Sequence, residues 1–142
     1  MSSIIVVDFG MGNLRSVAKA FEHVAPKATV RITGDVSVIR SADRVVLPGQ
    51  GAIGGYVKAL HDTDIEPAVL EAARSKPFLG ICLGQQVLYE SSDEHGEDGD
   101  SVQTLGLFKG QVKHFTHVSS DPQAMIDPHT GHQYTIPHMG WN

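Results

Sequence analysis

Short apolar runs recur along this chain, and the segments between them have the composition of helices. Ile4–Val7 is a continuous β-branched run, which is the pattern of a central parallel strand buried on both faces. Arg44–Leu47 and Pro77–Ile81 are further apolar runs of strand length, and residues 14–24 carry apolar side chains at helical spacing. Parallel strands need helical crossovers between them. We therefore predict an α/β fold, an open parallel sheet with helices on both faces.

The other elements follow from the same periodicities. Asn13 is expected to cap the helix over 14–24 because its side chain can accept from a free backbone N–H. Residues 91–104 are acidic and poor in apolar side chains, so we expect a mobile surface loop. We expect a single domain over residues 1–142. Further strands are expected at 28–32, 111–115 and 133–136, and helical segments at 35–40, 55–60, 65–75 and 83–89.

Composition narrows the class of protein. Cys82 is the only cysteine, so an internal disulfide is impossible and a reducing, cytoplasmic compartment is expected. The net charge of −5 argues against a nucleic-acid-binding surface. No run approaches the roughly 18 apolar residues of a membrane span. The expected partners therefore include neither nucleic acid nor membrane.

Cys82 lies where the predicted strand at 77–81 meets the predicted helix at 83–89, with Gly80 and Gly84 two residues away on either side. Glycines at these positions are typical of a nucleophile elbow, because a Cβ there would collide with the neighbouring strand or helix. A helix N-terminus lowers the pKa of a thiol, and the thiolate is the attacking form. The alternative is a buried cysteine acting as a small hydrophobic residue.

Functional loops of a parallel sheet lie at the carboxyl ends of its strands. Residues 8–13, 48–51 and the elbow at Cys82 all follow directly after predicted strands. We expect these three segments to form one site.

The motifs at these positions resemble a known family. Gly80–Gln86, with the sequence GICLGQQ, resembles the nucleophile motif of the class I glutamine amidotransferases, and Pro48–Gly51 resembles their oxyanion loop. Asp8–Ser16 and His138–Asn142 resemble more narrowly the glutaminase subunits of imidazole glycerol phosphate synthases, which belong to histidine biosynthesis. The resemblance covers the whole chain and implies a flavodoxin-like class I amidotransferase fold.

The resemblance implies the chemistry of the site. Cys82 would attack the side-chain amide of glutamine, release ammonia and leave a thioester that water cleaves to glutamate. The oxyanion would be held by the backbone N–H of Leu83 and by a second N–H from the segment Gly49, Gln50 and Gly51, through a flip of a peptide group.

The resemblance also implies a role for Gln86 and a partner protein. Gln86 would help to hold the substrate glutamine, or else is simply a solvated helix residue. The partner would be a (β/α)₈-barrel cyclase subunit that receives the ammonia in a heterodimer. No cofactor and no metal site are expected. Residues expected at the interface are Asn13, Pro137, His138, Met139, Trp141 and Asn142, although Asn13 could be only a helix cap and Trp141 could be buried within its own domain.

One departure from the family pattern limits this assignment. The family uses a histidine as general base and a glutamate two residues later, beyond the segment that matches His138–Asn142, whereas this sequence stops at Asn142. We expect a C-terminally incomplete domain with exposed apolar surface and an open strand edge. The pair His95 and Glu97 has the right spacing, but it lies in the expected surface loop and is not expected to act as the base. The alternatives are a truncated, non-catalytic binding subunit and the glutaminase of another class I amidotransferase, such as anthranilate synthase.

Overall fold

A computed structural model of the chain describes residues 2–95, 100–117, 121 and 125–134. The chain divides into two compact units, Met1–Val112 and Lys113–Asn142. In chain order, the elements of the first unit are β1 (Ser3–Val7), α1 (Leu14–Val24), β2 (Thr29–Thr33), α2 (Val36–Ser41), β3 (Arg44–Gly49), α3 (Ile53–His61), α4 (Ile65–Ser75), β4 (Phe78–Cys82), α5 (Leu83–Gln86), β5 (Ser91–His95), β6 (Ser101–Gln103) and β7 (Gln111–Val112).

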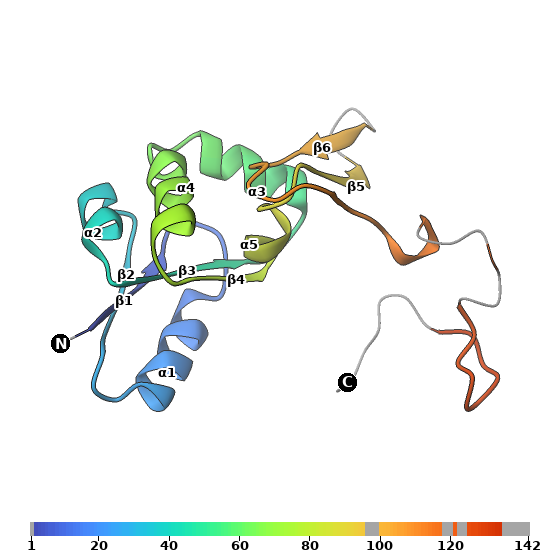
Figure 1. Ribbon diagram of the computed structural model, residues 1–142, viewed down its shortest axis with the longest axis horizontal. Helices are drawn as coiled ribbons and strands as arrows, with labels where there is room; N and C mark the ends of the chain where they lie inside the picture. The colour runs from blue at the N-terminus through green and yellow to red at the C-terminus, as the bar shows by residue number, and fades with distance from the viewer. Residues whose placement is uncertain (1, 96–99, 118–120, 122–124, 135–142) are drawn as a thin grey trace. The chain divides into compact units, whose positions relative to one another are not determined.

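The main sheet of the first unit has four strands in the order β2-β1-β3-β4, and every neighbouring pair is parallel. The predicted parallel α/β architecture is therefore confirmed. Helix α1 lies on one face of the sheet, whereas α2, α3 and α4 lie on the other (Figure 1). The four strands lie close to the ranges expected from the apolar runs. The runs in the inner strands β1 and β3 are buried, whereas the outer strands β2 and β4 are only partly covered.

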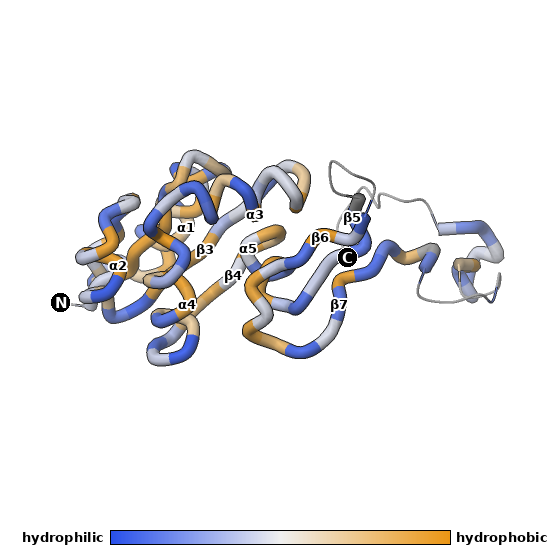
Figure 2. The backbone as a smooth tube through the Cα atoms, turned by 90° about the horizontal axis from the view of Figure 1, so that it is seen from above, coloured by the Kyte–Doolittle hydropathy of each residue, from blue (hydrophilic) through white to orange (hydrophobic). Residues whose placement is uncertain are grey.

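Alternate residues of the strands point to opposite faces and form two hydrophobic clusters. The smaller cluster lies under α1 and contains Ile4, Val6, Val46 and Ala18. The larger cluster lies under the other helices, and its strand residues are Ile5, Val7, Val45 and Leu47. The amphipathic character that this arrangement requires is visible along the helices, where hydrophobic and hydrophilic colours alternate (Figure 2).

The face of the sheet that carries α1 is only partly covered within the described first unit. Leu79 of β4 is 48% exposed on an outer strand, and Val24 at the end of α1 is 73% exposed. An apolar groove between α1 and β4 is lined by Val17, Phe21, Val24 and Ile81, among others. The expected exposed apolar surface is therefore present in the described part of the chain.

The expectation of a surface loop at 91–104 is wrong. Ser91–His95 forms β5 and Ser101–Gln103 forms β6, and these strands pair antiparallel in a three-stranded sheet with the order β6-β5-β7. Backbone pairing overrides the polar composition here: Thr104 N–H donates to the carbonyl of Glu90 at 3.1 Å, and Glu90 N–H donates to Gly110 at 3.0 Å. Residues 96–99 lie outside the described part.

Helix α5 ends at Gln86 rather than continuing to residue 89 as predicted. Val87 N–H still donates to the Leu83 carbonyl four residues back, whereas the N–H groups of Leu88 and Tyr89 donate to carbonyls three residues back, so the chain tightens after Gln86. The carbonyls of Val87, Leu88 and Tyr89 accept from Leu105, Phe108 and Gly106 at 2.8, 2.8 and 2.7 Å, respectively. The returning segment therefore pairs with the residues that directly follow α5.

The second unit contains a short hairpin and a 3₁₀ turn, η1 (Phe115–His117). The strand predicted at 111–115 is reduced to Gln111–Val112, and of the strand predicted at 133–136 the described part shows one antiparallel bridge, between Ile126 and Gln133. The carboxylate of Asp127 accepts from the backbone N–H of His129 at 2.8 Å and closes the turn between them. Across the described residues of the whole chain, no helix has the length and hydrophobicity needed to span a membrane.

Candidate active site

Cys82 is the last residue of β4 and stands immediately before α5. Its backbone has φ 55° and ψ −120°, and among the described residues it is the only non-glycine residue with positive φ. This region is costly for a side chain that carries a Cβ, and it persists only where the surrounding structure holds it. The side chain is exposed, so the alternative of a buried hydrophobic cysteine is wrong.

The flanking glycines hold the strand-to-helix turn against β3. A Cβ built on Gly84 would lie 1.8 Å from the carbonyl oxygen of Leu47, and one built on Gly80 would lie 2.5 Å from the carbonyl oxygen of Gly84. Neither position has space for any side chain, because both contacts are with backbone atoms that cannot move aside. The prediction that a Cβ at either position would collide with a neighbouring element is confirmed.

Gly49 pairs directly with Cys82 in the register of β3 and β4. A Cβ on Gly49 would meet the ring of Tyr56 at 2.6 Å, the nitrogen of Gly84 at 2.7 Å and the side chain of Leu83 at 2.8 Å. The end of β3 is therefore pressed between α3 and the elbow. Gln50 and Gly51 follow in the exposed loop, where Gly51 has φ 98°.

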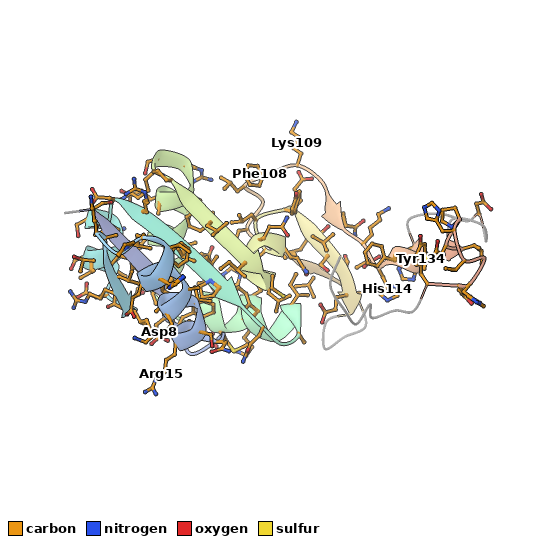
Figure 3. All side chains as sticks on the ribbon, turned by 90° about the horizontal axis from the view of Figure 1, so that it is seen from below. Asp8, Arg15, Phe108, Lys109, His114 and Tyr134 are labelled. Carbon is orange, nitrogen blue, oxygen red and sulfur yellow. The ribbon has the colours of Figure 1, made fainter. Side chains whose placement is uncertain are left out.

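The loop after β1 reaches the same place. A Cβ on Gly12 would lie 3.6 Å from the carbonyl carbon of Pro48 and 3.7 Å from the nitrogen of Gly49. The side chain of Met11 approaches Gly51, at 3.7 Å from the position of a Cβ there. Asp8 begins this loop beside the start of α1, while Arg15 of α1 points away from the sheet (Figure 3). The three expected loops therefore meet at one edge of the sheet.

Tyr56 of α3 is a site residue that the sequence reasoning missed. It is fully buried, and its hydroxyl donates to the carbonyl oxygen of Pro48 at 2.8 Å. Its ring also meets Phe9 edge to face, with the two centroids 4.9 Å apart. Burial raises the pKa of Tyr56, and electrostatic interaction with the nearby Cys82 raises that pKa further. The phenol is therefore a neutral hydrogen-bond donor at physiological pH.

Glu94 of β5 makes a contact with the start of α3 that was not predicted from the sequence. Its carboxylate accepts from the backbone N–H of Ile53 at 3.3 Å, at the N-terminus of α3. The N-cap residue of that helix, Ala52, has no side-chain acceptor of its own. A carboxylate from a distant strand therefore occupies the position of a capping group and also complements the helix dipole.

The remaining predicted site residues divide into those near the elbow and those elsewhere. Leu83 is buried at the first position of α5, where a backbone N–H has no acceptor within the helix, and Gln86 is half-buried at the other end of α5. Asn13 is the N-cap of α1 and accepts from Ser16 N–H at 3.4 Å, which confirms its predicted capping role. The interface residues Pro137, His138, Met139, Trp141 and Asn142 lie outside the described residues.

Of the His-x-Glu pair, His95 is the last residue of β5 and Glu97 lies outside the described residues. Within the described ranges, no three His, Cys, Asp or Glu side chains are placed to bind a metal ion. The site thus offers an exposed thiol on a strained backbone, close to the segments after β1 and β3.

Comparison with known proteins gives a consistent result. Residues 5–142 match the family model described as "Glutamine amidotransferase class-I". The "Imidazole glycerol phosphate synthase subunit HisH" of Nitrosospira multiformis is 46% identical over 142 residues, which are 100% of this chain and 62% of that protein. The protein of the same name from Thiobacillus denitrificans is 51% identical over 139 residues, 98% of this chain and 56% of that protein. The one from Nitrosomonas europaea is 49% identical, again over 100% of this chain and 62% of that protein. The chain therefore spans about three fifths of the length of these curated relatives.

Proposed function

Because this chain belongs to the class-I glutamine amidotransferase family, we propose that it carries the nucleophile of a glutaminase that supplies ammonia to an imidazole glycerol phosphate synthase. The observation that carries this proposal is the strained backbone of Cys82, paired with Gly49 at the carboxyl edge of the sheet. An exposed thiol on a strained backbone has no evident structural purpose, whereas a nucleophile needs exposure and a fixed orientation.

In the proposed reaction, the Cys82 thiolate adds to the side-chain amide carbon of glutamine and the carbonyl electron pair moves to oxygen. The tetrahedral intermediate collapses when the amide nitrogen takes a proton and leaves as ammonia, and a thioester remains. Water then cleaves the thioester and restores the thiol. The net change is glutamine and water to glutamate and ammonia.

The oxyanion of that intermediate needs donors whose positions are fixed in advance. We assign one donor to the backbone N–H of Leu83 and the other to the segment Gly49, Gln50 and Gly51. Support comes from the close packing of Gly49 against Leu83 and Gly84, which leaves no space for a Cβ. Gln86, half-buried one turn beyond the thiol, is the proposed contact for the amino-acid part of the substrate.

The proton steps need a general base, which the family resemblance places in a His-x-Glu pair beyond residue 142. The complete reaction is therefore proposed for a protein of the length of the relatives. A (β/α)₈-barrel cyclase is the proposed acceptor of the ammonia, with Asn13 and residues 137–142 at the interface. The reducing cytoplasm is the proposed compartment.

A glutamine-analogue electrophile tests the nucleophile directly. We expect 6-diazo-5-oxo-L-norleucine to label the chain once, at Cys82, and free glutamine to protect against labelling. Cys82→Ser is expected to abolish the labelling. The homologue of the diazoketone that is one methylene shorter, and so resembles asparagine, should label Cys82 much more slowly. Peptide mass spectrometry identifies the modified residue.

Labelling that persists in Cys82→Ser, or that glutamine does not slow, would contradict a glutamine-directed nucleophile. The acceptor pathway is tested separately in the longer protein with its barrel partner. Glutaminase activity should rise when the phosphoribulosyl ribotide substrate of the cyclase is added. A rise with chorismate instead would assign the chain to anthranilate or aminodeoxychorismate synthesis.

A further inference from the structure

The carbonyl of Pro48 accepts a hydrogen bond from the side chain of Tyr56, which belongs to α3. The Tyr56 hydroxyl donates to it at 2.8 Å, and the tyrosine is fully buried. A trans peptide is planar, with its C=O and N–H on opposite sides. Fixing the Pro48 oxygen therefore also fixes the orientation of the Gly49 N–H.

The two ends of the 49–51 segment differ in how tightly they are held. Gly49 lies against the ring of Tyr56, the nitrogen of Gly84 and the side chain of Leu83, all within 3 Å of where a Cβ would stand. Gly51 is exposed and has φ 98°, and among the described residues beyond its chain neighbours only Met11 lies within 4 Å of the corresponding position. Any rotation of a peptide group in this segment must then take place after the Pro48–Gly49 peptide.

We propose that Tyr56 is a positioning residue whose hydroxyl anchors the Pro48 carbonyl and so sets the orientation of the 49–51 segment relative to Cys82. This inference rests on the proposed function, in which that segment supplies an oxyanion donor. Tyr56 itself touches no reacting atom. The ring fills space between Phe9 and Gly49, and the hydroxyl alone provides the anchor.

The raised pKa of Tyr56 agrees with this role, since burial keeps the phenol protonated and able to donate. A neutral hydrogen bond contributes roughly 0.5–1.5 kcal/mol net, so its loss should change a local equilibrium by about threefold to tenfold. An effect of that size is measurable without loss of the fold.

Tyr56→Phe is the test variant because it keeps the ring and removes the O–H. Tyr89→Phe is the matched control, because the ring of Tyr89 packs against Phe108, which lies between β6 and β7. Two reagents are compared on each protein. The diazoketone analogue of glutamine places a carbonyl oxygen where the oxyanion forms, whereas iodoacetamide alkylates sulfur by direct displacement and needs no oxyanion donor.

For Tyr56→Phe we expect labelling by the diazoketone to slow about threefold to tenfold, with the rate and pH profile of iodoacetamide alkylation unchanged. Tyr89→Phe should change neither rate. Replacing Tyr56 by 4-aminophenylalanine, which restores an N–H donor at the same position, should recover most of the lost rate. Equal slowing of both reagents, or no slowing of either, would overturn the proposal.

Hydrogen exchange of the backbone gives a second measurement that does not depend on glutamine recognition. The amides of residues 49–51 should exchange about threefold to tenfold faster in Tyr56→Phe than in the unsubstituted chain, with the amides of β1 unaffected. Unchanged exchange at 49–51 would refute the anchor. Failure of the unsubstituted chain to react with the diazoketone would instead refute the proposed function, and hydrogen exchange would still decide the role of Tyr56.

Discussion

Gly84 lies directly against Leu47: a Cβ on the glycine would stand 1.8 Å from the carbonyl oxygen of the leucine. This contact joins the first turn after the nucleophile to the strand that carries the 48–51 segment. The close approach of two backbones is thus what places the thiol beside its expected oxyanion donors.

Gly84→Ala should therefore destabilise the protein strongly. The added methyl group cannot be accommodated without moving β3 or α5, and we expect a loss of about 3 kcal/mol or more in the free energy of unfolding. Urea denaturation measures this directly. The matched control is Gly55→Ala in α3, where no atom of the described part of the chain outside α3 itself lies within 4 Å of the new Cβ and the helix should gain about 1 kcal/mol. Similar losses for both variants would contradict the role of the contact.

The strain at Cys82 should be measurable as stability. Cys82→Gly relieves the positive φ at a cost in chain entropy, whereas Cys82→Ala removes only the sulfur and keeps the strained Cβ. We expect the glycine variant to be more stable than the alanine variant by about 1 kcal/mol. Both should lose labelling by the diazoketone. An alanine variant as stable as the glycine variant would show that the backbone at this position is unstrained.

Glu94 should stabilise the start of α3, and with it the end of the 48–51 segment. Glu94→Ala removes the acceptor of Ile53 N–H, and we expect a loss of roughly 1 kcal/mol in stability together with faster exchange of that amide. Glu94→Gln keeps an acceptor oxygen without the charge and should recover part of the loss. If the alanine variant exchanges as slowly as the unsubstituted chain, the capping contact is not formed in solution.

The titration of Tyr56 should appear at alkaline pH. Because burial raises its pKa in the folded state, the folded protein binds more protons than the unfolded chain once the pH exceeds the ordinary tyrosine value of 10.0. The contribution of Tyr56 is therefore fully present below that pH and decreases as the pH rises toward the folded-state pKa. Denaturation curves of the unsubstituted chain and of Tyr56→Phe should have the same pH dependence up to about pH 9 and diverge above it, with the phenylalanine variant losing less stability. Parallel curves throughout would contradict the raised pKa.

The sequence was sufficient for the main sheet and the elbow because both depend on local patterns. A β-branched run such as Ile4–Val7 predicts a buried strand wherever it lies, and Gly80 and Gly84 around Cys82 predict a tight turn whatever the neighbouring element is. The convergence of the loops after β1, β3 and β4 also followed, because parallel strands bring their carboxyl ends to one edge.

The sequence was insufficient where pairing between distant segments overrides local composition. Residues 91–95 are polar and were therefore predicted to be a solvated loop. They form β5 instead, through backbone hydrogen bonds that do not depend on the type of side chain. The chain directly after α5 is paired in the same way, because the N–H groups of residues 105, 106 and 108 donate to the carbonyls of residues 87–89.

Tyr56 was missed for a related reason. Its contact with Pro48 depends on the rotation of α3 about its own axis and on its distance from β3. Neither quantity is encoded by the spacing of eight residues between donor and acceptor. An aromatic side chain with a polar tip on the inward side of a helix is the one available signal, because a buried phenol hydroxyl usually has a hydrogen-bond partner.

Strand β1 occupies an inner position of the sheet although it precedes both of its partner strands in the sequence. Its partners are β2 and β3, so Ile4 cannot complete its ladder until Arg44 has left the ribosome. Closing such long chain segments is slow compared with forming a helix. During synthesis the β-branched run at Ile4–Val7 must therefore wait for both of its neighbours before its two edges are paired.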